Sequence, residues 1–238
     1  RRDAPWYYRI AGVWGGSEGS LLLFVAIVAA VAAVASRRAS PRSTWFAAAT
    51  VTALASISVL VASPFTRLAL PAVRGFGLTP ILEHPAMAAH PPLLYAGFGC
   101  TLGVLMAAID GRNPRRWLRA AATLILLAML LGAVWSYVEQ GWGGYWAWDP
   151  VENAALMPWL VATAFLHSVM VQEKKDMLRV WNVILVALAF CLSLFGTFLT
   201  RSGVLNSIHS FAESSIGPWL LGFICVVALA SVALIVSR

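Results

Sequence analysis

The segment WLRAAATLILLAMLLGAVWSY, residues 117–137, carries a single charged side chain, that of Arg119. A helix needs about 20 mainly apolar residues to cross the hydrocarbon layer of a bilayer, so this segment is typical of a transmembrane span. Alanine and leucine dominate it, which favours a helix over the shorter alternating strands of a barrel. Comparable apolar stretches occur at 21–36, 43–63, 92–109, 154–171, 180–199 and 218–236.

The composition of the whole chain agrees with a membrane protein. Of its 238 residues, 60% are hydrophobic and only 11% are charged, which excludes an ordinary soluble globular domain. We therefore predict an all-α fold, a polytopic transmembrane bundle of about seven spans that forms one domain over residues 1–238. Residue 1 is an arginine and no signal peptide precedes the first stretch, so we expect the chain to be part of a longer protein.

The net charge of +7 does not indicate a nucleic-acid partner, because most of the basic residues fall in the loops on one side of the predicted spans. The loops of a membrane protein that are richer in lysine and arginine normally lie on the cytoplasmic side. It predicts that loops 64–91, 138–153 and 200–217 lie outside the cytoplasm, in a multi-pass protein of the bacterial inner membrane with lipid as its surroundings. The cytoplasmic group is Arg37, Arg38, Arg42, Arg112, Arg115, Arg116, Arg119, Lys174, Lys175, Arg179 and Arg238, against Arg1, Arg2, Arg9, Arg67, Arg74 and Arg201 outside.

The three cysteines point to packing rather than chemistry. Cys100, Cys191 and Cys225 all lie within predicted spans and form neither a CxxC nor a CxxCH pattern. This argues against a disulfide framework, a zinc knuckle and haem attached to the chain itself. We expect them to act as small packing residues.

A tryptophan-rich loop is the most informative part of the sequence. It holds Trp142, Tyr145, Trp146 and Trp148, separated by glycines and followed by Trp159. One interpretation is an aromatic belt at the membrane interface, although belts usually place only one or two rings at a helix end. The alternative, which we favour, is a platform over 138–160 whose folded backbone lines an apolar slot for a flat ring such as a porphyrin.

Two carboxylates in this loop resemble a catalytic pair, but local structure explains them better. Asp149, Pro150 and Glu152 match the N-cap, N1 and N3 positions of a capping box at the start of the fifth span. Such a cap would fix the angle at which the tryptophan loop leaves the helix. We expect no catalytic residue in the usual sense.

Histidines flank the tryptophan loop on both sides in the sequence. His90 directly precedes Pro91 and Pro92, which predicts a stiff, extended backbone at the mouth of the third span. His209 follows the sixth span, and the pair could bind an iron axially. Each could instead be a solvated surface residue, which is the interpretation we favour for His84, placed in a mobile loop.

The remaining candidates are one histidine within a span and three outer arginines. His167 lies in the fifth span, where an ionisable group is rare; it is either a neutral imidazole bonded to a neighbouring helix or a ligand of a second, membrane-embedded haem. Arg67, Arg74 and Arg201 could pair with haem propionates through their guanidinium forks, or could simply be solvated at the interface.

These motifs resemble the CcmF-type cytochrome c haem lyases of the cytochrome c maturation system. The resemblance spans nearly the whole chain. The related CcmC and CcsA proteins share the tryptophan-rich "WWD" motif, but the runs DPVEN (149–153) and RSGV (201–204) resemble the lyases more. The segments that carry it are 12–20, 90–95, 142–159 and 200–211.

The resemblance implies a set of haem contacts. His90 and His209 would be the outer ligands of an incoming haem, and Trp142, Trp146, Trp148 and Asp149 would lie against it. His167 would be one of two ligands of a haem b whose other ligand lies beyond residue 238. Ser17 departs from the pattern, in which the resemblance would lead us to expect a histidine at this position.

The resemblance also implies an activity, the attachment of haem vinyl groups to the cysteine thiols of a CxxCH motif in apocytochrome c. The carrier CcmE would supply haem, and a CcmH-type chaperone or reductant would present the apocytochrome. This chemistry needs orientation rather than a nucleophile from the protein. Two alternatives are a haem-delivery or export protein without lyase chemistry, and a cytochrome b, which should show several histidines within its spans where only His167 occurs.

Overall fold

The computed structural model describes residues 4–67, 69, 75, 77–141, 143–205, 207, 209–211 and 215–237. Within these ranges the chain forms helices and connections, and no strand. The elements are α1 (Trp6–Ala11), η1 (Gly12–Trp14), α2 (Ser17–Ser36), α3 (Pro41–Leu60), η2 (Pro80–Leu82), α4 (Pro85–Ile109), α5 (Arg115–Glu139), α6 (Pro150–Lys175), α7 (Arg179–Arg201) and α8 (Gly217–Val236).

Helices α2 to α8 are long and apolar enough to cross a membrane, and they correspond one to one to the predicted spans. The prediction of an all-α transmembrane bundle is therefore confirmed. Most boundaries move by a few residues, but α4 begins at Pro85, well before the predicted 92. The short helix α1 and the 3₁₀ turns η1 and η2 were not predicted.

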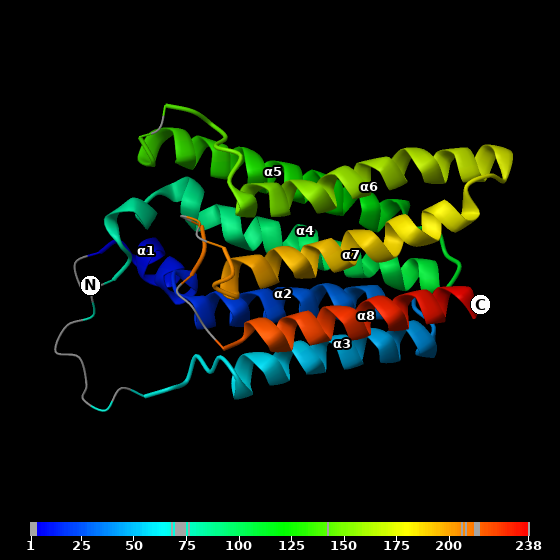
Figure 1. Cartoon of the computed structure of the whole chain (residues 1–238), viewed down its shortest axis with the longest axis horizontal. Helices are drawn as coiled ribbons and strands as arrows, with labels where there is room; N and C mark the ends of the chain where they lie inside the picture. The colour runs from blue at the N-terminus through cyan, green and yellow to red at the C-terminus, as the bar shows by residue number, and fades with distance from the viewer. Residues whose placement is uncertain are drawn as a thin grey trace.

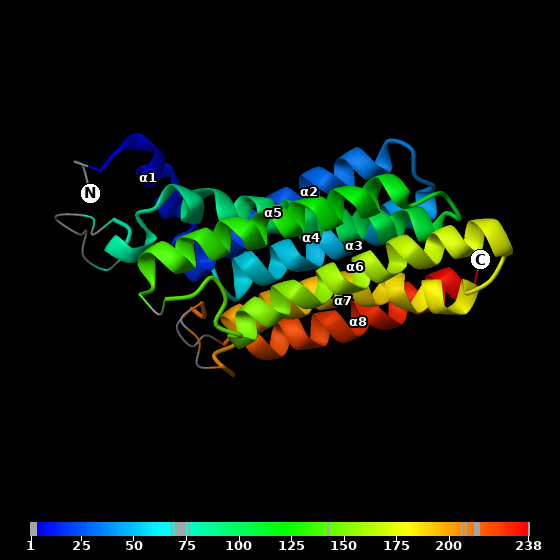
Figure 2. The same ribbon diagram turned by 90° about the horizontal axis from the view of Figure 1, so that it is seen from above.

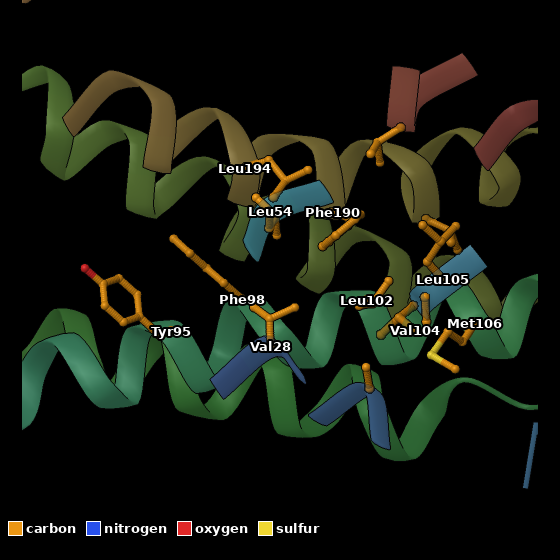
Figure 3. Close-up of a cluster of buried hydrophobic side chains, with 14 of the residues drawn as sticks. Val28, Leu54, Tyr95, Phe98, Leu102, Val104, Leu105, Met106, Phe190 and Leu194 are labelled. Atoms are coloured by element: carbon orange, nitrogen blue, oxygen red, sulfur yellow. The ribbon is translucent and has the colours of Figure 1, made fainter. Parts of the chain in front are cut away.

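Helices α4 and α7 form the centre of the bundle, and the other long helices surround them (Figure 1). Side chains from four helices meet there, including Leu102 of α4, Phe190 of α7, Val28 of α2 and Leu54 of α3, all fully buried (Figure 3). In a bilayer, close packing rather than escape from water holds such helices together. Gly97 shows how close α4 and α5 come, since a Cβ there would lie 2.9 Å from the backbone nitrogen of Ile125.

The connections between helices alternate between the two ends of the bundle (Figures 1 and 2). One end carries α1, η2 and the connections α5–α6 and α7–α8; we call it the aromatic end because the tryptophan loop lies there. The opposite end carries the α2–α3, α4–α5 and α6–α7 connections and the carboxyl terminus. The loops predicted to share one side of the membrane thus do share one end of the bundle.

Candidate functional site

His90 lies within a helix, which corrects the expectation of a loop residue with extended backbone. It occupies the second turn of α4, with Pro91 and Pro92 following inside the same helix. A proline disfavours helical geometry in the residue before it, but helices of membrane proteins tolerate proline because neighbouring groups satisfy the freed backbone atoms. His84 is the N-cap of α4, its Nδ1 accepting the N–H of Ala86 at 3.1 Å, and so does not lie in a mobile loop.

The ring of His90 is fixed against α5. Its Nδ1 lies 2.7 Å from the carbonyl oxygen of Ala128. Because a carbonyl can only accept, Nδ1 carries a proton, and in the neutral ring Nε2 then keeps its lone pair. Gly132, one turn further along α5, leaves room for the ring, since a Cβ there would lie 3.0 Å from both Nδ1 and Cε1.

His209 is held by the N-terminus of α6. Its Nδ1 lies 3.2 Å from Oδ2 of Asp149, and the two side chains are only 20% and 13% exposed. The same Oδ2 accepts the hydroxyl of Ser207 at 2.7 Å and the N–H of Val151 at 2.9 Å. Trp135 of α5 packs edge-on against the His209 ring, with the ring centroids 6.0 Å apart. The α7–α8 connection is thereby tied to both α5 and α6.

The predicted capping box at the start of α6 is confirmed. Asp149 caps the helix, Pro150 is its first residue, and Oε2 of Glu152 accepts the N–H of Asp149 at 3.2 Å. The same Oε2 also accepts the N–H of Ala147 at 2.9 Å. The carboxylates of this loop therefore fix the path of its backbone.

His90 and His209 line one cavity at the aromatic end. Its volume is about 280 Å³, near the lower end of the range for cofactor-sized pockets, and Tyr95, Trp135 and Arg201 also line it. A smaller cavity of about 80 Å³ shares both histidines and Trp135. Among the residues that the structure describes, no group lies within hydrogen-bonding range of Nε2 in either ring. The Nε2 atoms of both rings are thus accessible to a ligand in the cavity.

None of the described tryptophans of the loop lines the larger cavity. Trp146 lines the smaller cavity together with both histidines. It also lines an apolar groove of about 350 Å³ on the outside of α5 and α6, with Trp148 and Trp159. Trp148 is 71% exposed and lines that groove. Trp146 is half-buried, so the two described tryptophans of the platform differ, one lying beside the histidines and the other facing out of the bundle. Trp142 lies outside the described residues.

Arg201 is the last residue of α7 and is buried, which corrects its placement in an outer loop. Its Nη2 donates to Oγ of Ser20 at 2.7 Å and to the hydroxyl of Tyr95 at 3.1 Å, and its Nη1 donates to Oγ1 of Thr200 at 2.9 Å. The guanidinium also lies over the ring of Phe211, 5.4 Å from its centroid. The positive charge therefore joins α2, α4 and α7 in the wall of the cavity.

The other predicted candidates lie elsewhere. Arg67 is exposed and does not line the cavity, and Arg74 lies outside the described residues. His167 is exposed on α6, with its Nδ1 2.8 Å from the carbonyl oxygen of Thr163. In the part of the chain that the structure describes, no group of three or more His, Cys, Asp or Glu residues is arranged to hold a metal ion.

Several residues of the cavity wall were not among the site residues predicted from the sequence. Ser20, Tyr95 and Phe211 belong to the quoted motifs, so motif membership was a signal that could have identified them. Trp135 gave no such signal, because within an apolar span it is indistinguishable from a packing residue. Only the fold shows that it touches the His209 ring.

The fold is a bundle of membrane-crossing helices, and two histidines line a cavity at one of its ends. These features define a polytopic membrane protein with a ligand-binding cavity. Residues 112–205 match the family model described as "Cytochrome C assembly protein". The chain is 40% identical to the cytochrome c-type biogenesis protein CycK of Bradyrhizobium diazoefficiens, over 98% of this chain and 38% of that protein. It is 39% identical to CcmF of Pseudomonas aeruginosa, over 98% of this chain and 39% of that protein.

A solved structure agrees with these sequence matches. The structure titled "Cytochrome c Heme Lyase CcmF" superposes with a TM-score of 0.72 at 33% identity, covering 99% of this chain and 38% of that one. The chain is thus similar in sequence and in fold to CcmF-type cytochrome c biogenesis proteins, in agreement with the resemblance of its motifs. It spans about two fifths of the length of these relatives.

Proposed function

We propose that this chain binds haem in the cavity between His90 and His209 and orients it for covalent attachment to apocytochrome c. The observation that carries the proposal is the pair of histidines in one cavity, each with Nδ1 engaged and Nε2 available. Haem iron accepts axial imidazole ligands of this kind. Haem here is a substrate that arrives and leaves with the product.

The walls of the cavity suit the rest of the haem molecule. Leu94, Phe98, Trp135 and Phe211 offer apolar surface to the macrocycle. Arg201 supplies a buried positive charge for a propionate, and guanidinium groups pair with carboxylates more strongly than neutral donors do. In this proposal Trp146 closes the side of the site nearest α5 and α6.

The reaction that follows requires little chemistry from the chain itself. A thiol of the CxxCH motif adds across a vinyl group: sulfur bonds to one vinyl carbon and the thiol proton passes to the other. No oxidant or external nucleophile is consumed. The contribution of the chain is to hold the macrocycle at a fixed angle and to limit which vinyl group meets which thiol.

The aromatic end faces outward in this proposal, toward the periplasm or the cell exterior, in a bacterial inner membrane. The bias of basic residues toward the opposite end supports this orientation. The partners would be a haem carrier of the CcmE type, apocytochrome c, and a CcmH-type protein that keeps its thiols reduced. Relatives are named cytochrome c-type biogenesis proteins, which supports such a set.

We also propose that His167 ligates a second, membrane-embedded haem b together with a residue outside the described part of the chain. Its exposed position on α6 supports this, because an imidazole on the surface of a membrane helix requires a polar or metal partner. When bound, such a haem would supply electron transfer, while His167 would provide one ligand and Thr163 would hold its Nδ1 proton.

The proposal is tested by forming a cytochrome in cells that lack their own CcmF-type protein. We expect the protein carrying this chain, expressed with a CxxCH-containing apocytochrome, to yield haem that stays on the cytochrome after denaturation. His90→Ala and His209→Ala should each lower that yield by about tenfold or more, because removing even a supporting residue of a metal ligand costs 10–100-fold. Haem bound by the parent without any thioether product would contradict lyase function and favour a haem-delivery protein.

The space beside the His90 ring gives a separate prediction. Gly132→Val would add two methyl groups beyond a Cβ already 3.0 Å from the ring, so we expect the imidazole to leave the Ala128 carbonyl. Overpacking of this kind costs about 1–3 kcal/mol, roughly ten- to hundredfold in haem affinity. The measurement is haem titration in detergent. Gly222→Val on α8 is the matched control, since a Cβ there meets nothing within 4 Å, and equal affinities in the two variants would contradict the placement of His90.

A further inference from the structure

The two histidines of the cavity differ in the group that holds their Nδ1. His90 is bonded to a neutral carbonyl, that of Ala128, whereas His209 faces the carboxylate of Asp149. Both rings line the same cavity, so they would face one ligand with unequal support. The capping box accounts for the role of Asp149 at the start of α6. It does not account for the contact between Asp149 and His209.

We propose that Asp149 is a positioning residue for His209, holding its ring as the Nδ1–H tautomer and making it the stronger of the two haem ligands. This inference rests on the proposed function and deepens it. Asp149 lines neither of the two cavities that contain the histidines, so we assign it a role through His209 rather than the direct haem contact that the resemblance implied. A carboxylate behind a ligating histidine fixes the ring orientation and raises the basicity of the other nitrogen.

The geometry around Asp149 explains how one carboxylate serves two purposes. Its Oδ2 accepts the N–H of Val151 at 2.9 Å, which anchors the carboxylate to the first turn of α6. It also accepts from Ser207 at 2.7 Å and from His209 at 3.2 Å, and both donors belong to the α7–α8 connection. The helix cap thus gives the carboxylate a fixed position, and that position in turn fixes a ring on a different segment of the chain.

The groups around Asp149 and His209 allow the Asp149 carboxylate to interact with the His209 ring. Asp149 and His209 are 13% and 20% exposed, so solvent weakens their interaction less than it would at the surface. Glu152 is occupied with the N–H groups of Ala147 and Asp149. Trp135 covers the His209 ring edge-on from the α5 side and adds no charge. The carboxylate of Asp149 is therefore the charged group in contact with the Nδ1 of His209.

Two substitutions separate capping from the action on His209, because asparagine and serine are about as good as aspartate at an N-cap. Asp149→Asn keeps an acceptor of the same shape and removes the charge. Asp149→Ser keeps the cap but is too short to reach the ring. Asp176→Asn, at the other end of α6 and exposed beside Arg179, removes a carboxylate far from the cavity and is the matched control.

The first measurement is ¹⁵N NMR of histidine-labelled protein without haem, at a pH at which the imidazoles are neutral. We expect the parent and Asp149→Asn to show His209 as the Nδ1–H tautomer, and Asp149→Ser to show a mixture of tautomers. The second measurement is haem titration with the midpoint potential of the bound haem. Asp149→Ser should lose about 10–100-fold in affinity for ferric haem, and Asp149→Asn should raise the potential, because a less basic ligand favours ferric iron less.

The outcomes distinguish this inference from the proposed function. If His209→Ala loses haem while both Asp149 variants keep the parental tautomer, affinity and potential, Asp149 is only a helix cap and the inference is wrong. If His209→Ala binds haem as tightly as the parent, the proposed function itself fails, whatever the NMR spectra show. If the potential shifts in Asp176→Asn as much as in Asp149→Asn, the effect is a general loss of charge, and the inference is again wrong.

Discussion

His90→Ala is expected to lower haem affinity by about 100-fold or more, since even the loss of a residue that only supports a ligand costs 10–100-fold. The substitution removes the imidazole but leaves Trp135, Arg201 and the apolar wall in place. Imidazole added to the solution can fill the space that is left, so it should restore most of the binding. His209→Ala should lose at least as much affinity, because Asp149 supports that ring, and imidazole should again restore most of the binding. The double variant should respond much less because both fixed ligands are gone. The measurement is the optical spectrum of each variant with and without imidazole.

His84→Asn is the control for the histidine variants. His84 caps α4 through Nδ1 and does not line the cavity, and asparagine preserves an N-cap. Its spectrum should match that of the parent. If His90→Ala and His209→Ala also keep the parental low-spin spectrum without imidazole, these residues do not ligate the iron.

Arg201→Gln is expected to lower haem affinity by roughly ten- to hundredfold, because a hydrogen bond to a charged group contributes about 1.5–3 kcal/mol. The ligand offers an independent test of this contact. The parent should bind haem more tightly than haem dimethyl ester, whose propionates carry no charge, and Arg201→Gln should bind both alike. Arg201→Lys keeps the charge but loses the guanidinium fork, so it should retain part of the preference.

The ester comparison remains decisive if Arg201→Gln fails to fold. Arg201 joins Ser20, Tyr95 and Thr200, and its replacement could disturb the packing of α2 against α4 and α7. The parent protein alone then gives the answer. Equal affinity of the parent for haem and its dimethyl ester would show that Arg201 holds the bundle together and does not bind a propionate.

Local patterns in the sequence were enough to predict the spans and the cap of α6. Apolar runs of membrane-crossing length correspond to α2 through α8, because lipid allows few alternatives for a backbone that must satisfy its own hydrogen bonds. Asp149, Pro150 and Glu152 form the expected capping box, since those contacts span only a few residues. Loops that are separated by an even number of spans emerge at the same end of the bundle, so the predicted spans also predict which loops lie together.

Contacts between distant segments could not be predicted in the same way. The rule for residues that precede proline failed at His90, where packing within the bundle outweighs a local preference. The burial of Arg201 depends on hydroxyls of Ser20 and Tyr95 from two other helices. The contact between His209 and Asp149 joins residues 60 positions apart in the sequence. Such pairs are properties of the tertiary fold.

The most direct test of the account is a count of the histidine nitrogens bound to the iron. In protein labelled with ¹⁵N-histidine and loaded with ferric haem, pulsed EPR measures the hyperfine coupling of each axial nitrogen. We predict that the parent protein contains a low-spin iron at this site with two coupled histidine nitrogens. In His90→Ala and in His209→Ala, with unlabelled imidazole completing the coordination, one of these two couplings should disappear. A spectrum in which both couplings persist in either variant would contradict the assignment of His90 and His209 as the ligands.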